Sequence, residues 1–66
     1  MKILLTEKEK KVMELRAQGL DQYEIARRMK ITQAAVSQFQ TNAYRKIKEA
    51  VNLIEFAKKN GIVFLP

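Results

Sequence analysis

Five small or polar residues recur along one side of the segment that begins at position 33. Gln amides, Ser and Thr hydroxyls and an Ala methyl group are all able to contact base edges in the major groove of duplex DNA. A helix face that is only solvated usually carries Lys and Glu, so the absence of charge here favours base contact. The alternative interpretation is a neutral helix surface without a partner. At helical spacing, the candidate base contacts are Gln33, Ala34, Ser37, Gln38 and Thr41.

Basic residues flank this face and account for the whole net charge. The 66 residues include 13 Lys and Arg and 7 Asp and Glu, a formal charge of +6. Residues 27–48 contain six bases and no acid, whereas the rest of the chain is balanced. A polyanionic partner, double-stranded DNA, is therefore expected. The expected contacts to its backbone are Gln22, Tyr23, Arg27, Arg28, Lys30, Arg45 and Lys48, while Lys46 is expected toward a subunit interface.

The composition argues against an enzyme. With no Cys and no His, the chain lacks thiolate ligands, disulfides and the most common general base and metal ligand. We therefore expect no catalytic residue, no metal and no cofactor. The opening MKILL is too short for a signal peptide, and no apolar run approaches the roughly 18 residues of a membrane span, so a cytoplasmic protein is expected. Abundant Lys and Glu would suit a thermophile.

Three capping signals predict the elements that position these residues. Thr6 with Glu9, and Asp21 with Glu24, have the spacing of a capping box, and Thr32 provides a third cap. The first helix should end at Gly19, and the second should span residues 22–29. Only residues 30–32 separate the second helix from the third, which is the tight turn of a helix-turn-helix. The expected core residues are Val12, Met13, Leu15, Ile25, Ala26, Met29, Ile31, Val36 and Phe39.

The third helix is predicted to be unusually long. Apolar residues recur every three or four positions, and neither Gly nor Pro interrupts the run before Gly61, which favours one helix over residues 33–59. The alternative is a break near Thr41 and Asn42, with Asn42 capping a fourth helix. A continuous helix would project beyond a three-helix core and would pack against a second chain, so a homodimer is expected. The expected interface is Ile47, Ala50, Val51, Ile54, Ala57, Ile62 and Phe64, and a seam line through these positions also includes Ala43.

The sequence thus predicts an all-α fold: a helix-turn-helix core of three helices with a long C-terminal helix. A single domain spans residues 1–66, with a core at 6–48 and a dimerisation helix and tail at 49–66. Residues 3–5 and 62–65 form short apolar runs at the two termini. They are expected either to cover the core or to pair as strands, or pack, across a dimer.

Residues of the three predicted helices and of the segments next to them resemble a pattern shared by LuxR-type regulators, region four of bacterial sigma factors and archaeal Tfx regulators. The resemblance covers about residues 5–54 and is closest to the Tfx type, in which a long helix follows. It implies a four-helix, wingless helix-turn-helix that binds duplex DNA in transcription control, with Gln33, Ala34, Ser37 and Gln38 at the base-contacting positions. The matching residues are Leu5, Thr6, Val12, Leu15, Arg16, Gly19, Glu24, Ile25, Ala26, Val36, Ser37, Gln38, Ala43, Lys46, Ile47, Ala50 and Ile54.

Two departures from this pattern qualify the resemblance. Lys30 occupies the turn where many of these proteins have Gly or Asn, so it must adopt a left-handed conformation or the turn must differ in shape. Proteins of the Tfx type also continue into a further domain, whereas this sequence ends at Pro66.

The expected function is sequence-specific DNA binding by a homodimeric transcription regulator. A sigma-like adaptor that contacts the transcription machinery and a non-specific architectural DNA-binding protein are the alternatives. A basic helix lying on an anionic membrane is a weaker one.

Overall fold

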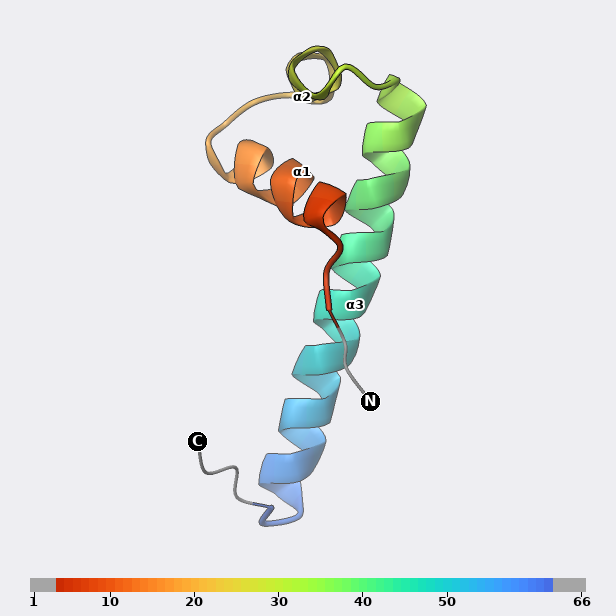
Figure 1. Ribbon diagram of the computed structural model, residues 1–66. Coiled ribbons are helices and arrows are strands. Elements are labelled where there is room, and N and C mark those ends of the chain that lie inside the picture. The colour runs from red at the N-terminus through yellow and green to blue at the C-terminus, as the bar shows by residue number, and fades with distance from the viewer. Residues whose placement is uncertain (1–3, 63–66) are drawn as a thin grey trace.

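The protein is built from three helices, and their bounds agree with the predicted ones. The computed structural model describes residues 4–62 and contains α1 (Glu7–Ala17), α2 (Gln22–Met29) and α3 (Gln33–Lys59), as Figure 1 shows. The described residues contain no strand. The all-α class and the long C-terminal helix are therefore confirmed.

Side-chain caps explain where the helices begin. The N–H of Glu9 donates to the Thr6 hydroxyl over 3.1 Å, and the N–H of Thr6 donates to the Glu9 carboxylate over 2.9 Å. Asp21 and Glu24 form a second capping box at the start of α2. Because each box satisfies two backbone N–H groups that have no partner within the helix, these starts are fixed by local sequence. The side chain of Thr32 caps α3.

The core lies where α1 and α2 pack against the N-terminal half of α3. Each helix contributes fully buried aliphatic side chains, and burial of each of these is worth about 1.5–3 kcal/mol. The buried cluster is Val12, Leu15, Ile25, Ala26 and Val36, with Leu20, Met29, Ile31 and Phe39 partly buried around it.

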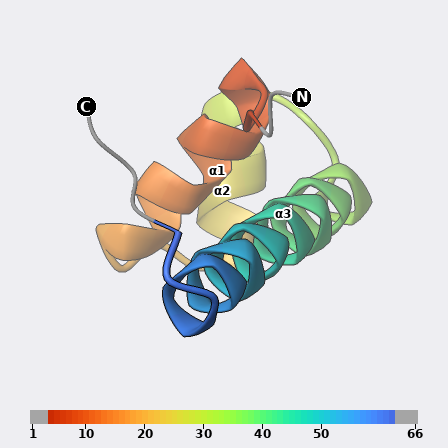
Figure 2. The same cartoon turned by 90° about the horizontal axis from the view of Figure 1, so that it is seen from below.

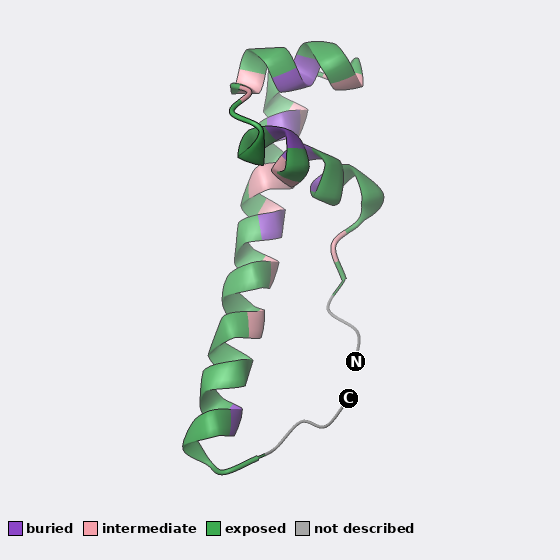
Figure 3. Cartoon of the chain, turned by 90° about the vertical axis from the view of Figure 1, so that its left-hand side faces the viewer, coloured by how far each residue is buried: buried purple, intermediate pink, exposed green. Residues whose placement is uncertain are grey.

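α3 continues without a break beyond the core. Its 27 residues correspond to about 40 Å of helix. Figures 1 and 2 show α1 and α2 together on one side of its first half, while the second half projects past them and is mostly exposed in Figure 3. The molecule consequently measures 45 × 20 × 18 Å. None of the helices in this part of the chain has the length and apolar character to cross a membrane.

The continuity of α3 settles the alternative at Asn42. The chain does not break there, so the four helices implied by the resemblance are not found within residues 4–62. Residues 33–59 form one helix because no Gly or Pro interrupts them. The preferred prediction of a continuous helix is confirmed.

The turn between α2 and α3 depends on a left-handed residue that is not glycine. Lys30 has φ 57° and ψ 46°, which places it in the left-handed region. This conformation usually favours Gly, and an L side chain there costs about 1 kcal/mol. Gly19, with φ 91°, follows α1 without that cost. Of the two possibilities for this turn, the structure shows the left-handed one.

The predicted terminal strands fall partly outside the described residues. Residues 1–3 and 63–66 are not described, and these include Ile3 of the first apolar run and residues 63–65 of the second. Leu4, Leu5 and Ile62, which are described, are not in a strand.

Replacing Lys30 with Gly should stabilise the fold. The substitution removes the left-handed penalty of an exposed side chain, and we expect a gain of about 1 kcal/mol, or a few degrees in Tm. Circular dichroism melting measures it. Lys10→Gly, at an exposed site within α1, is the matched control and should lose about 1 kcal/mol. Equal losses in both variants would show that Lys30 bears no strain.

Candidate nucleic-acid interface

The five predicted base-contact residues share the solvent side of the first turns of α3. All five are exposed, whereas Val36 and Ala43 on the opposite side are fully buried. No acidic residue lies in the first turn of α3, although α1 and α2 both begin with acidic residues. The positive end of the α3 dipole is therefore not offset by a carboxylate, which favours an approaching anion.

A hydrogen bond within α3 fixes one of these side chains. Gln38 Nε2 donates to Asn42 Oδ1 over 3.0 Å, one turn further along. Asn42 is half-buried, so the Gln38 amide is held at the edge of the exposed face. From the sequence alone, Asn42 is predicted only as a possible helix cap. The i, i+4 spacing of an amide pair was the signal that could have identified this contact.

The N-terminus of α2 is tied to the N-terminus of α3 by Gln22. Its Nε2 donates to the main-chain carbonyl of Gln33 over 3.0 Å. The side chain of Gln22, which was expected to meet the DNA backbone through the N-terminus of α2, thus links the two helices of the helix-turn-helix. Tyr23, the next residue, is 64% exposed and offers its phenol to solvent.

The predicted phosphate contacts form two groups. Arg27, Arg28 and Lys30 are exposed on α2 and the residue that ends it. Arg45 and Lys48 lie four and seven residues after Thr41, so at 3.6 residues per turn they extend the side that carries the base-contact residues. The structure therefore places one group on α2 and one along α3.

A surface ion pair weakly restrains the second group. Arg45 lies 3.6 Å from Glu49, and both side chains are more than half exposed. Pairs of this kind contribute at most about 0.5 kcal/mol, so a phosphate can displace the Glu49 carboxylate.

Lys46, which was expected toward a subunit interface, is bound within the chain. Its Nζ lies 2.8 Å from the Glu9 carboxylate and donates to the Leu4 carbonyl over 3.3 Å. Glu9 is only 3% exposed. The charge of Lys46 is therefore offset by Glu9, the carboxylate of the α1 capping box, 37 positions away.

This ion pair also changes the acidity of Glu9. Hydrogen bonds from Lys46 and from the Thr6 N–H lower the pKa of Glu9, against the opposing effect of burial. The folded state thus favours the charged carboxylate.

Tyr44 is a further candidate contact that is not among the residues predicted from the sequence. It is half exposed and lies seven residues after Ser37, on the same side of α3. Its position between Ser37 and Lys48 would let the phenol reach a phosphate. The helical spacing alone could have identified it.

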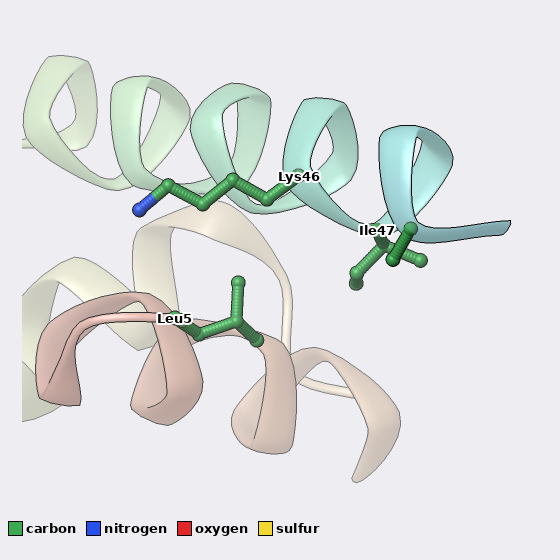
Figure 4. A pocket seen from close by; sticks show the side chains of 4 residues that line it. Leu5, Lys46 and Ile47 are labelled. Carbon is green, nitrogen blue, oxygen red and sulfur yellow. The ribbon is translucent and has the colours of Figure 1, made fainter. Parts of the chain in front are cut away.

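The predicted dimer residues on α3 follow one line along this helix, which begins at the buried Ala43. Figure 4 shows Leu5 and Ile47 facing across a small hollow beside Lys46, where this line leaves the core; Ala50 also lines the hollow. Ile47, Val51 and Ile54 remain 41%, 46% and 49% exposed.

Two members of the expected seam differ from expectation. Ala43 is fully buried and Ala57 is 3% exposed within the single chain, so neither offers area to a partner. Near Ala57 the backbone turns back after α3, and the N–H of Ile62 donates to the Ala57 carbonyl over 2.8 Å. Ile62 is half exposed, and Phe64 lies outside the described residues.

The described residues contain no group of three acidic side chains that could hold a metal ion. The polar groups of the exposed α3 face can donate and accept hydrogen bonds, and the surrounding bases can bind anions. This combination defines a helix-turn-helix domain whose third helix presents a neutral polar face between cationic flanks.

Comparison with known proteins places this domain in a family. Residues 4–57 match the bacterial regulatory proteins of the luxR family. A protein of Pyrococcus abyssi named as a candidate transcriptional regulatory protein is 50% identical over 54 residues, which cover 82% of this chain and 37% of that protein. The DNA-binding protein Tfx of Methanothermobacter thermautotrophicus is 39% identical over 57 residues, which cover 86% of this chain and 41% of that protein. No solved structure gives a significant match.

The chain therefore belongs to the LuxR-type helix-turn-helix family, and its relatives include Tfx. The resemblance predicted from the sequence is confirmed. The family consists of regulatory proteins rather than enzymes, in agreement with the expectation from the composition. The chain spans 37–41% of the length of these curated relatives.

The ion pair between Glu9 and Lys46 should make stability depend on acid pH. Because the pKa of Glu9 is lowered on folding, its contribution is present above the unfolded pKa and is lost as pH falls through the folded pKa. Glu9→Gln retains the capping geometry but removes the charge. We expect this variant to have a lower Tm than wild type at pH 7 and a smaller deficit near pH 3.

Thermal melts between about pH 7 and pH 3 measure this difference. Glu14→Gln is the control, since Glu14 is exposed and has no ion pair among the described residues. The difference in Tm between this variant and wild type should not decrease toward pH 3. A Glu9→Gln deficit that stays constant over the range would contradict the coupling.

Proposed function

We propose that this chain is a sequence-specific DNA-binding transcription regulator and that the first half of α3 enters the major groove. The observation that carries the proposal is the exposed, uncharged side of α3 between two cationic groups that contain no acid. The name of the relative Tfx, a DNA-binding protein, supports it. In this arrangement the neutral side chains contact bases and the cations contact phosphates.

The dimensions of α3 suit this placement. A helix with its side chains is about 10–12 Å across, and the major groove is about 12 Å wide. Arg45 and Lys48 lie about 18 Å and about 22 Å along the axis from Gln33, at 1.5 Å per residue. They would reach the phosphate backbone at one edge of the groove, while Tyr23, Arg27, Arg28 and Lys30 approach from α2.

The protein is proposed to act as a homodimer formed by the second half of α3. Ile47, Val51 and Ile54 share a side of this half and remain close to half exposed in the single chain. On folding, 66 residues bury only about 60% of the surface that they expose when unfolded, and a second copy would cover these side chains. Two recognition helices related by a twofold axis would read half-sites about 34 Å apart.

A protein-interaction adaptor is the second candidate. Leu53 and Phe56 are 53% and 60% exposed and lie outside the line of Ile47 and Ile54 on α3. Such residues could contact the transcription machinery without involving the base-contact residues. Substituting Ser37 and Gln38 by Ala would leave an adaptor active but would impair base recognition.

DNA affinity should depend steeply on salt. If the five proposed cations Arg27, Arg28, Lys30, Arg45 and Lys48 each meet a phosphate, log affinity falls with log salt at a slope of about −4.5 per protomer. Fluorescence anisotropy at several KCl concentrations measures the slope. Absence of duplex binding at low salt would reject the proposal, and binding without sequence preference would indicate an architectural protein instead.

Paired variants test the assignment of individual cations. Arg45→Gln should reduce the magnitude of the slope by about 1, because one counterion fewer is released. Lys11→Gln removes a charge from the exposed surface of α1 and should leave the slope unchanged. Equal effects of the two variants would mean that net charge, and not the α3 contact, determines binding.

A charge in the proposed interface should separate the subunits. Ile54→Glu would bury a carboxylate against the partner helix, and we expect a 7.7 kDa monomer in sedimentation equilibrium at micromolar concentration, where wild type is a dimer. Circular dichroism should still show α1 and α2. Asn52→Glu, on the exposed side of the same helix, is the control and should remain dimeric. A monomeric wild type would contradict the dimer, and a dimeric Ile54→Glu would place the interface elsewhere.

A further inference from the structure

The base-contact side of α3 lacks the side chains that best recognise G·C pairs. Residues 33–44 contain no Arg or Lys, the usual partners of guanine, and no Asp or Glu, which accept from the cytosine amino group. The exposed groups are instead the amides of Gln33 and Gln38, the hydroxyl of Ser37 and the methyl groups of Ala34 and Thr41.

These groups complement A·T pairs. Adenine presents an acceptor at N7 and a donor at N6, which match the N–H and carbonyl of one Gln amide. Thymine adds a methyl group that can contact the methyl groups of Ala34 or Thr41. Guanine presents two acceptors, so a Gln amide that donates to guanine leaves its own carbonyl without a partner.

The structure orients one amide for this task. Because Gln38 donates one N–H to Asn42 over 3.0 Å, the other N–H and the Oε1 atom have no partner among the described residues. These two groups are the donor and acceptor that adenine requires. Asn42 also limits the freedom of the Gln38 side chain before binding, which reduces the entropy lost on contact.

We infer that α3 reads A·T base pairs, with Gln38 contacting an adenine and Asn42 acting as the positioning residue that orients it. This inference rests on the proposed duplex binding and adds the chemical class of the half-site. Ala34 and Thr41 favour thymine at neighbouring positions.

Selection of bound sequences from random duplex DNA, with the full chain, is the first test. A·T pairs should be enriched at the centre of each half-site.

In the selected site, 7-deazaadenine in place of the contacted adenine removes only N7 and should weaken binding about 5-fold or more. The same replacement outside the site is the control. Enrichment of G·C pairs, or no preference among bound duplexes, would overturn the inference although the protein binds DNA.

A change of specificity provides a sharper test. Gln38→Glu has nearly the same shape but can only accept hydrogen bonds when ionised, so it should favour cytosine, whose amino group donates. Competition between duplexes that differ at one base pair measures, for each variant, the ratio of its affinities for the two duplexes. A general loss of affinity for DNA affects both duplexes equally and cancels in this ratio. A ratio that stays in favour of adenine would exclude Gln38 as the residue that reads this position.

The role of Asn42 is tested by Asn42→Ala, with Asn52→Ala as the matched control. Alanine favours helix, so the fold should persist. Discrimination for adenine should fall about 2- to 10-fold in Asn42→Ala, corresponding to the freedom regained by one side chain. The salt slope should not change, and Asn52→Ala should match wild type in both. Unchanged discrimination in Asn42→Ala would overturn the positioning role, and absence of binding to any duplex by wild type would overturn the proposed function itself.

Discussion

The continuity of α3 is the constraint on which the other features depend. Its backbone hydrogen bonds run from Gln33 to Lys59, so the proposed base-contact residues and the exposed apolar residues belong to one rigid element. At 100° per residue, Ile54 lies about 140° around the axis from Thr41. The two surfaces therefore face largely different directions, and a partner on one does not obstruct the other. In the proposed dimer, this fixed rotation sets how the two recognition segments are presented to DNA.

Charge is distributed in the structure differently from its distribution along the sequence. The basic segment of residues 27–48 does not form a single patch, because Lys46 turns inward to Glu9 and Arg45 pairs with Glu49. The remaining cations lie on α2, on the residue after it and on α3. The neutral side of α3 lies between them, near the N-terminus of this helix. Such a division separates the groups that supply affinity for a polyanion from the groups that supply selectivity.

Much of the fold follows from short-range sequence signals. The caps at Thr6, Asp21 and Thr32 and the glycine after α1 each act within a few residues, and for this reason the sequence alone predicts the helix bounds. Two of the contacts that it does not predict join distant positions: Lys46 with Glu9, and Gln22 with Gln33. Periodicity places a residue on a side of a helix but does not specify which neighbouring helix covers it. Ala43 and Ala57 show this, because both lie on the predicted apolar side yet are buried within their own chain.

The second half of α3 links stability to assembly. A helical segment gains most of its stability from packing of its apolar side, and this half lies beyond α1 and α2 (Figure 3). In a single chain, Ile47, Val51 and Ile54 remain close to half exposed, so they contribute less to the stability of the fold than fully buried side chains do. A second copy that covers them would stabilise the same helix that carries Gln38 and Asn42. Dimer formation and DNA recognition would then favour each other, because both require α3 to remain a single, fully formed helix.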